Sequence, residues 1–385
     1  MNDRTTPDSD FIHIETQAAF DALRGPVGSA ALIAVDTEAA SFHRYRDRIY
    51  LVQLSTRSLT AVVDPLAVSD LTVLGHWLAD PSKEKVFHDA DYDLRILHRD
   101  YGHTAANLFD TRIAAQLLDE PGIGLAALLL KYVGVTLDKK YQRADWSVRP
   151  LQPGMLDYAA ADTRYLPVLR DILKERLVAA QRWSWAEEEF RLLEEVRWTP
   201  PGPPEEAYLR LKGARTLKGH QLAVLRELFA WREVTASQLD RAPFRVLMNE
   251  AMLTIAAAMP KDETALRDLK VLSSEQLRRR GADLLDAVSR GVGAPPESIP
   301  VFPRIRRPPP DLAYEARLER LKVARNRVAA RLPLAPGVLC PNGILEGIAR
   351  AAVERVEDLR QIAGMREWQR QVLGAELLAA SAGSA

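Results

Sequence analysis

The first third of the chain alternates short apolar runs with polar, turn-forming stretches, which is the pattern of β-strands joined by loops. Most of the runs end at residues such as Asp, Ser or Pro, which favour turns. The pattern predicts one strand near Phe11 and further strands at residues 31–38, 49–55, 60–64, 85–87 and 108–110.

Between and after these runs, apolar residues recur every three or four positions, as on the buried face of a helix. Thr16 and Asp110 stand where helix N-caps are expected, and Gly134 stands at a C-cap position. Pro167 lies inside the longest of the predicted helices and is expected to kink it. Helices are expected at residues 17–23, 71–78, 89–99, 111–118, 124–132 and 155–177, whereas residues 139–153 have no period and are expected to form a loop.

Strands that cluster early, with helices between and after them, indicate an α/β fold with a mixed sheet flanked by helices. Two proline-rich runs, residues 199–204 and 293–310, are typical of linkers. No strand pattern follows the first linker. We therefore expect an α/β domain at residues 1–204 and two small all-helical bundles at residues 205–292 and 311–385, similar in length as diverged repeats would be.

The composition supports a folded protein, because 47% of the 385 residues are hydrophobic. The single cysteine, Cys340, excludes an intramolecular disulfide and a cysteine-rich zinc module, and it fits a reducing compartment. Residues 1–10 are polar and do not resemble a signal peptide, and no apolar run has the length of a membrane helix. The sequence therefore predicts a soluble cytoplasmic protein.

The net charge of zero conceals an asymmetry between the two halves of the chain. Residues 1–204 carry 23 Lys and Arg against 30 Asp and Glu, whereas residues 205–385 carry 29 against 22. This difference fits an acidic metal-binding half joined to a half that grips a polyanion. Ordinary solvated helix faces would give the same numbers.

Two carboxylates end the apolar run 31–35. Residues i and i+2 of a strand project from the same face, so Asp36 and Glu38 are expected to lie a few ångströms apart. Carboxylates held together raise each other's pKa unless a cation lies between them, and oxygen ligands suit Mg²⁺ or Mn²⁺. The alternative is a strand that enters a polar loop with two solvated acids.

Further acids stand at two other places. The stretch from His88 to Leu94 contains three aspartates, and physical reasoning alone does not say which of them faces a site; Asp89 could simply cap a helix. Tyr158 and Asp162 are four residues apart on a predicted helix and therefore share a face. The three alanines between them would let this face approach a sheet closely.

The segment 145–151 lies just before this helix and contains Trp146, which we expect to be exposed, beside Arg149. Four carboxylates from separate elements can hold two divalent ions, which activate water and stabilise the leaving oxygen of a phosphodiester. A phenol near that water can orient or deprotonate it.

These motifs, in this order, resemble the ribonuclease D family of 3′–5′ exonucleases. Asp36-Thr37-Glu38 is similar to the first exonuclease motif, and Val52-Gln53-Leu54 to the strand that follows it. In the second motif the aspartate directly before leucine is the ligand, which assigns Asp93. Residues 145–151 resemble the segment before the third motif, and Tyr158 with Asp162 resembles that motif in its tyrosine form.

The second half of the chain resembles the helical domain shared by RecQ-type helicases and ribonuclease D. Its first copy carries Trp231-Arg232 and Pro243-Phe244. Residues 311–380 resemble a degenerate second copy, in which these signatures are missing although Asn342 and the apolar pattern after it are kept.

The resemblance implies a metal-dependent exoribonuclease. One Mg²⁺ or Mn²⁺ ion would be held by Asp36, Glu38 and Asp162, and a second by Asp36, with Asp93 contributing through water. Tyr158 would position the attacking water. The implied substrates are single-stranded RNA 3′ ends, such as those of tRNA precursors, with nucleoside 5′-monophosphates as products. The implied enzyme is a monomer that does not bind membranes.

Substrate contacts are expected from Phe42, His43 and Gln53, although Phe42 and His43 are equally compatible with packing or loop roles. A 3′–5′ DNA exonuclease is the main alternative, since the same chemistry serves both sugars and only a contact with the 2′-hydroxyl separates them. A catalytically inactive scaffold that binds nucleic acid is disfavoured because all four acids and Tyr158 are present. Phosphate contacts in the basic half are expected from arginines of the second linker and the helix after it, namely Arg304, Arg306, Arg307, Arg317, Arg320, Arg325 and Arg327.

Overall fold

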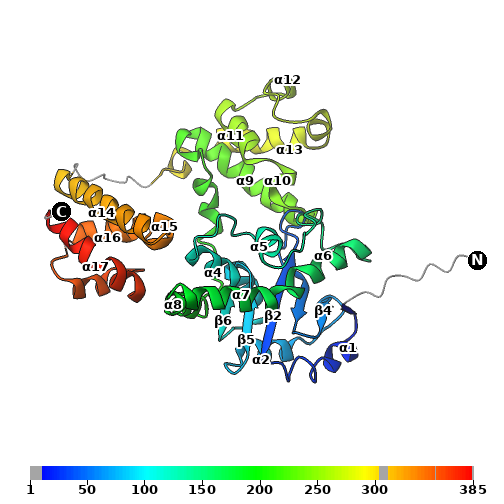
Figure 1. The fold of residues 1–385 in the computed structure, drawn as a ribbon. Helices are drawn as coiled ribbons and strands as arrows, with labels where there is room; N and C mark the ends of the chain where they lie inside the picture. Colours follow the sequence, from blue (N-terminus) through cyan, green and yellow to red (C-terminus); the bar gives the residue numbers. More distant parts are fainter. Residues whose placement is uncertain (1–10, 303–310, 352, 384–385) are drawn as a thin grey trace, which may run out of the picture.

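The computed structural model describes residues 11–302, 311–351 and 353–383, so that Arg304, Arg306 and Arg307 lie outside the described residues. Its N-terminal domain is built on a six-stranded sheet in the order β1-β4-β3-β2-β5-β6 (Figure 1). β3 runs antiparallel to both of its neighbours, and the other strand pairs are parallel, so the expected mixed sheet is confirmed. The strands are β1 (Ile12–Ile14), β2 (Leu32–Ala39), β3 (Ile49–Ser55), β4 (Thr60–Val63), β5 (Glu84–Phe87) and β6 (Leu108–Asp110).

Helices cover both faces of the sheet, and β2 shows why its sequence is an unbroken apolar run. Ile33 and Val35 belong to the hydrophobic cluster on one face, whereas Leu32 and Ala34 belong to the cluster on the other. Alternate residues of a strand point to opposite faces, so a strand covered on both sides must be apolar at every position. The helices of this domain are α1 (Gln17–Ala22), α2 (Thr72–Ala79), α3 (Asp91–Tyr101), α4 (Thr111–Leu117), α5 (Leu125–Tyr132), α6 (Pro153–Arg164), α7 (Leu166–Ala179) and α8 (Trp183–Leu193).

The expected helix ends are confirmed. Thr16 accepts a hydrogen bond from the amide of Ala19, and Asp110 accepts from the amides of Arg112 and Ile113. Gly134 follows α5 with a φ of 74°, the left-handed conformation that ends many helices.

The kink expected at Pro167 in the helix predicted over residues 155–177 is confirmed as a break at Tyr165, which divides this helical stretch into α6 and α7. Pro167 lies in the first turn of α7, where its missing N–H costs nothing, whereas inside one continuous helix that N–H would be needed to bond the carbonyl oxygen four residues earlier. α8 was not predicted.

The first helical domain consists of helices only. The 3₁₀ helices η1 (Pro204–Arg210) and η2 (Ala214–Thr216) lead into α9 (His220–Gln238), α10 (Pro243–Val246), α11 (Asn249–Ala258), α12 (Glu263–Asp268) and α13 (Ser274–Val292), followed by η3 (Pro296–Ser298). One hydrophobic cluster joins residues from Tyr208 to Val288. α9 and α13 form its longest helix pair. In Figure 1, α9 and α10 lie above the end of the sheet at which β2 finishes.

The second helical domain repeats the internal bonding of the first. It consists of α14 (Leu312–Arg331), α15 (Pro336–Leu339), α16 (Asn342–Ala351), η4 (Val356–Gln361) and α17 (Glu367–Ala382). In the first domain Arg232 donates to the carbonyl oxygen of Leu247 and to Asn249, 15 and 17 residues ahead. In the second domain Arg325 donates to the carbonyl oxygen of Cys340 and to Asn342, at the same two spacings. The arginine and the asparagine of the repeat are therefore both kept, and the expectation that the second copy lacks the whole Trp-Arg signature is wrong for its arginine.

This bonding corrects the roles expected for the arginines of α14. Arg325 is buried inside the domain, and its guanidinium is used by Cys340 and Asn342. Arg317 donates to the carbonyl oxygen of Ala349, and Arg320 to that of Ala380. All three arginines tie α14 to the rest of its domain, so a role for buried Arg325 as a phosphate contact is wrong.

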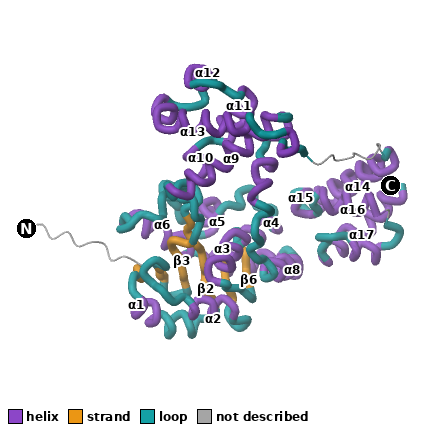
Figure 2. Tube along the Cα trace, turned by 180° about the vertical axis from the view of Figure 1, so that it is seen from behind, coloured by secondary structure: helices purple, strands orange, loops and turns teal. Residues whose placement is uncertain are grey.

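The second helical domain packs against α8 (Figure 2). Trp185 of α8 stacks on Trp368 of α17, with ring centroids 4.8 Å apart. The backbone amides of Glu367 and Trp368 donate to Glu188 of α8, so an acid of one domain caps a helix of another. Over the described part of the chain, none of the helices combines the length and apolar character that crossing a membrane requires.

Candidate active site

β2 carries two acids toward the same side of the sheet. Asp36 and Glu38 are separated by one residue and therefore share a face. The antiparallel register with β3 places Gln53 opposite Asp36 and Leu51 opposite Glu38. The register shifts directly after Glu38, which ends the regular pairing and releases the chain into the loop at residues 40–48.

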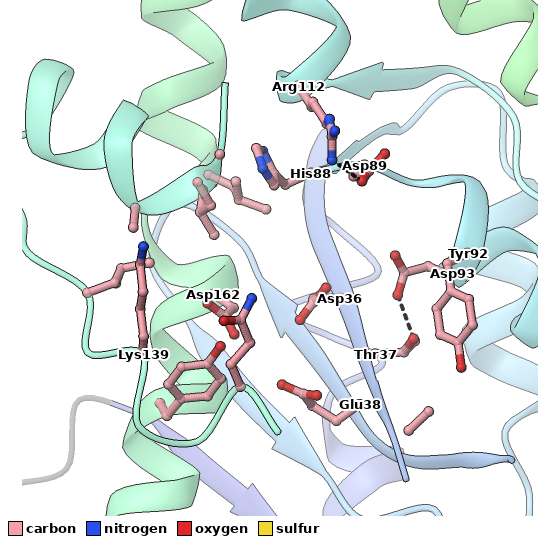
Figure 3. A pocket seen from close by; sticks show the side chains of 18 of the residues that line it. Asp36, Thr37, Glu38, His88, Asp89, Tyr92, Asp93, Arg112, Lys139 and Asp162 are labelled. Carbon is pink, nitrogen blue, oxygen red and sulfur yellow. Dashed lines mark hydrogen bonds and ion pairs between the residues drawn. The ribbon is translucent and has the colours of Figure 1, made fainter. Parts of the chain in front are cut away.

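α6 brings a third carboxylate to these two. It packs across β2, β3 and β4, and its Ala159 and Ala160 are fully buried, as expected for a helix face that approaches a sheet closely. Carboxylate oxygens of Asp36, Glu38 and Asp162 all lie within 4.8 Å of one another. Figure 3 shows the three side chains turned toward a common centre.

Asp93 approaches from the other side of β2. Its Oδ1 accepts a hydrogen bond of 2.5 Å from the hydroxyl of Thr37, the residue between the two acids of the strand (Figure 3). The two other aspartates of this stretch are exposed and paired with arginines, Asp89 with Arg112 and Asp91 with Arg95. Asp93 is thus the buried member of the three.

Burial makes all four acids hard to ionise. It raises the pKa of Asp36, Glu38 and Asp93 well above the ordinary values, and the negative charges of neighbouring carboxylates raise these pKa values further. The pKa of Asp162 rises to about 7, mainly through burial. Four acids that repel one another in a partly buried site are stabilised by a cation placed between them, and their oxygen atoms are the ligands that hard divalent ions prefer. The acids form a candidate divalent metal site.

Tyr158 is held between two aromatic rings, one turn before Asp162. Its ring centroid lies 6.3 Å from that of Tyr141 and 6.0 Å from that of Trp146. Burial, followed by the charges of Asp162 and Glu38, raises the pKa of the phenol well above its usual value. The phenol is therefore protonated at neutral pH.

The prediction that Trp146 is exposed is wrong. Its side chain is 1% exposed and packs in the hydrophobic cluster that includes Ala159, Ala160 and Tyr158. Arg149 anchors this segment, because its guanidinium pairs with Asp64 and donates to the carbonyl oxygens of Trp146 and Tyr50. The segment before α6 thus supports Tyr158 from behind.

The acids and Tyr158 line a pocket of about 720 Å³. Four polar residues that line this pocket were not among the predicted site residues, namely His88, Arg112, Lys139 and Gln142. His88 is neutral at physiological pH, because burial lowers its pKa to about 4. Its nitrogen Nδ1 lies 2.8 Å from the hydroxyl of Thr111. Such wall residues have no sequence period, so only the fold brings them together.

The three expected substrate contacts lie in different surroundings. Phe42 lines the pocket and is 48% exposed. His43 is turned into the loop, where its Nε2 lies 2.9 Å from the carbonyl oxygen of Arg143. Gln53 is fully buried on β3, and neither atom of its amide has a hydrogen-bond partner among the described residues.

Comparisons with known proteins agree on the family of both halves. The family described as 3′-5′ exonuclease matches residues 11–178, and the HRDC domain family matches residues 221–288 and 315–380. The same HRDC family thus matches one segment of each helical domain.

Individual relatives extend the similarity to nearly the whole chain. Ribonuclease D of Granulibacter bethesdensis is 33% identical over 354 residues, which covers 90% of this chain and 86% of the relative. The crystal structure of Escherichia coli RNase D, described as an exoribonuclease involved in structured RNA processing, superimposes with a TM-score of 0.70 and 26% identity over 97% of this chain and 99% of that one. The exosome complex component 10 homolog of Caenorhabditis elegans is 36% identical over 259 residues, but the match spans only 30% of its length.

Proposed function

Because the chain belongs to the ribonuclease D family and is a 3′–5′ exoribonuclease, we propose that it hydrolyses RNA 3′ ends at the acids around Asp36 with two bound divalent ions, Mg²⁺ or Mn²⁺. The observation that carries this proposal is the meeting of Asp36, Glu38 and Asp162 within 4.8 Å. Asp36, Glu38 and Asp162 would hold one ion, and Asp36 with Asp93 the other. Bound ions would supply positive charge to the phosphodiester and lower the pKa of water.

The chain's own groups would orient the reaction. Thr37 fixes Asp93 through its hydroxyl, and Tyr141 and Trp146 fix the ring of Tyr158. The raised pKa of Tyr158 keeps the phenol protonated, so its oxygen would orient the attacking water as a hydrogen-bond acceptor rather than as a phenolate base.

The products follow from the position of attack. Water oxygen joins the phosphorus of the terminal linkage, and the bond from phosphorus to the 3′ oxygen of the preceding nucleotide breaks. That oxygen takes up a proton and becomes the new 3′-hydroxyl. The terminal nucleotide leaves as a nucleoside 5′-monophosphate, and the shortened strand can be cut again.

We assign tRNA precursors and other stable RNAs as substrates, in the cytoplasm, with the enzyme acting as a monomer. Relatives named ribonuclease D that are similar over most of this chain support an RNA substrate. The described role of the Escherichia coli relative in structured RNA processing supports stable RNAs over messenger RNA.

One experiment tests both the reaction and the sugar. 5′-labelled RNA and DNA oligonucleotides of one sequence are incubated with the full chain, with Mg²⁺ or with a chelator. We expect a ladder that shortens from the 3′ end and releases nucleoside 5′-monophosphates from RNA only when the metal is present. Asp162→Asn should abolish the ladder. Internal cuts, products that carry a 3′-phosphate, or a preference for DNA would contradict the proposal.

A further inference from the structure

Two exposed phenylalanines from different domains meet at the rim of the acid pocket. Phe42 comes from the loop after β2 and lines the pocket, and Phe244 comes from α10 of the first helical domain. Their ring centroids are 6.3 Å apart, edge to face, and the side chains remain 48% and 42% exposed. Large aromatic side chains gathered in contact on a surface commonly mark a binding site.

The position of this pair does not depend on the rings themselves. The guanidinium Nε of Arg245 donates to the carbonyl oxygen of Phe42 at 2.5 Å, and the amide of Ala242 donates to the carbonyl oxygen of His43 at 3.1 Å. Arg44 and Asp240 add an ion pair between the same two segments. Contacts to the main chain of the loop therefore hold α10 in place, and both rings remain partly exposed.

The contact between the second helical domain and α8 is an aromatic contact that holds two domains together, and it differs from the Phe42–Phe244 pair. There Trp185 and Trp368 stack nearly parallel, Trp368 is 3% exposed, and its indole nitrogen donates to Glu189. In the repeat alignment fixed by Arg232 and Arg325, Gly337 takes the place of Phe244. The helical fold thus does not itself require a phenylalanine at this position.

A guanidinium group lies close to each ring of the pair. The guanidinium of exposed Arg143 lies 5.5 Å above the ring of Phe42, and that of Arg245 lies 6.0 Å from the ring of Phe244. Arg280 donates to the carbonyl oxygen of Val246 at the end of α10. Burial and then the charges of Arg241 and Arg279 lower the pKa of Arg280, so these three arginines lie close enough to interact. Glu275 pairs with Arg279, one turn away on the same helix.

Aromatic faces next to cations are the means by which proteins bind single strands without reading their sequence. We propose that Phe42 and Phe244, with the guanidinium of Arg143, form a stacking platform for the unpaired bases of the RNA strand that enters the acid pocket, and that Arg241 and Arg280 face its phosphates. The proposal rests on the proposed function, because that function places the 3′ end among the acids. The platform is shared by the catalytic domain and the first helical domain, so binding of the strand couples the two.

The test pairs the removal of a ring with the removal of a base. The full chain carrying Glu38→Gln, which blocks hydrolysis, is titrated with single-stranded RNAs in which one abasic site is moved stepwise from the 3′ end, and binding is followed by fluorescence anisotropy. We expect one or two positions at which the missing base weakens binding on the order of tenfold. Phe244→Leu or Phe42→Leu should weaken binding of intact RNA similarly, but add no further loss at those positions.

Leucine keeps an apolar side chain in the contact between the domains, and thermal unfolding checks that each variant is folded. Val292→Ala is the matched control, since it removes an exposed apolar side chain from the same helical domain. It should leave the abasic profile unchanged. A loss of equal size at every abasic position, or no loss, would overturn the platform.

The outcome is separable from that of the proposed function. If a phenylalanine substitution and a missing base do not add, but the chain with Glu38 intact hydrolyses no RNA, the platform is supported and the proposed function is contradicted. Metal-dependent release of monophosphates without such coupling would do the reverse.

Discussion

The hydroxyl of Thr37 donates a 2.5 Å hydrogen bond to Asp93, and so links the strand that carries two of the acids to the helix that carries the fourth. Thr37 points to the face of β2 opposite that of Asp36 and Glu38. Its hydroxyl can therefore bond Asp93 while its two neighbours face the other acids. Partners that orient metal ligands typically change metal affinity or activity tenfold or more when removed.

We expect Thr37→Val to lower hydrolysis on the order of tenfold and to raise the Mg²⁺ concentration needed for half-maximal rate. Valine keeps the shape of threonine but removes the hydroxyl donor of a buried carboxylate, which keeps only its backbone donors. Thr37→Ser, which keeps the hydroxyl, should retain most of the activity. Equal losses in the two variants would mean that the methyl group, and not the hydrogen bond, is what matters.

Asp93 and Asp91 offer a matched pair of substitutions in the first turn of α3. Asp93→Ala should abolish hydrolysis, as should Asp36→Ala, Glu38→Ala and Asp162→Ala, while the fold persists because one member of a repelling cluster is removed. Asp91→Ala should retain activity, since Asp91 is 53% exposed and paired with Arg95. Activity in the first variant and its loss in the second would reverse the assignment.

Tyr158→Phe removes the hydroxyl while its ring stays packed between Tyr141 and Trp146. We expect kcat to fall on the order of 10²-fold, as for other groups that position a reacting proton or water. Mg²⁺ binding, measured by calorimetry, should hardly change. Unaltered turnover would leave Tyr158 a structural role only.

The four acids also predict how the stability of the metal-free protein depends on pH. Their folded-state pKa values are raised, to about 7 for Asp162, above the values near 4 of an unfolded chain. Between these values the folded state binds more protons than the unfolded state, so the free energy of unfolding falls as pH rises through this window. The melting temperature in chelator should therefore be lower at about pH 8 than at about pH 5, as far as these acids are concerned.

Mg²⁺ should restore much of this loss at about pH 8, because it binds the ionised acids of the folded state. Asp162→Asn removes one titrating group and should flatten the dependence on pH. A melting temperature in chelator that rises steadily over this range in the parent chain, with no change in Asp162→Asn, would show that the acids do not control it.

The meeting of Asp36, Glu38 and Asp162 could be predicted because strand and helix periods place their side chains. Asp36 and Glu38 are two residues apart on an apolar run, and Tyr158 and Asp162 are one helical turn apart, so local geometry is enough. The choice of Asp93 over Asp89 and Asp91 needed the family resemblance, since all three stand near a helix start. Composition did not show that Trp146 is buried, because its burial depends on Arg149 folding the segment back onto Asp64 and Tyr50.

Contacts between domains were beyond local patterns altogether. Phe42 and Phe244 are brought together by hydrogen bonds from the side chain of Arg245 and the amide of Ala242 to the main chain of the loop, which join segments far apart in the sequence. The same holds for Trp185 and Trp368. The charge count of the second half was misleading in a related way, because a count of arginines does not show which of them are enclosed by the fold.

Arg325 and Arg327 lie on the same helix, and comparing them distinguishes an arginine that holds the domain together from one that is available to bind phosphate. Arg325 is 7% exposed and bonded within its domain, whereas Arg327 is exposed. We expect Arg325→Gln to lower the melting temperature, because the buried carbonyl oxygen of Cys340 and the side chain of Asn342 lose their donor. The salt dependence of RNA binding, measured for the folded full chain below its melting temperature, should be unchanged.

Arg327→Gln should leave the melting temperature as it is, and if Arg327 faces a phosphate it should reduce the salt slope by about one. A reduced salt slope in Arg325→Gln with unchanged stability would restore Arg325 as a phosphate contact.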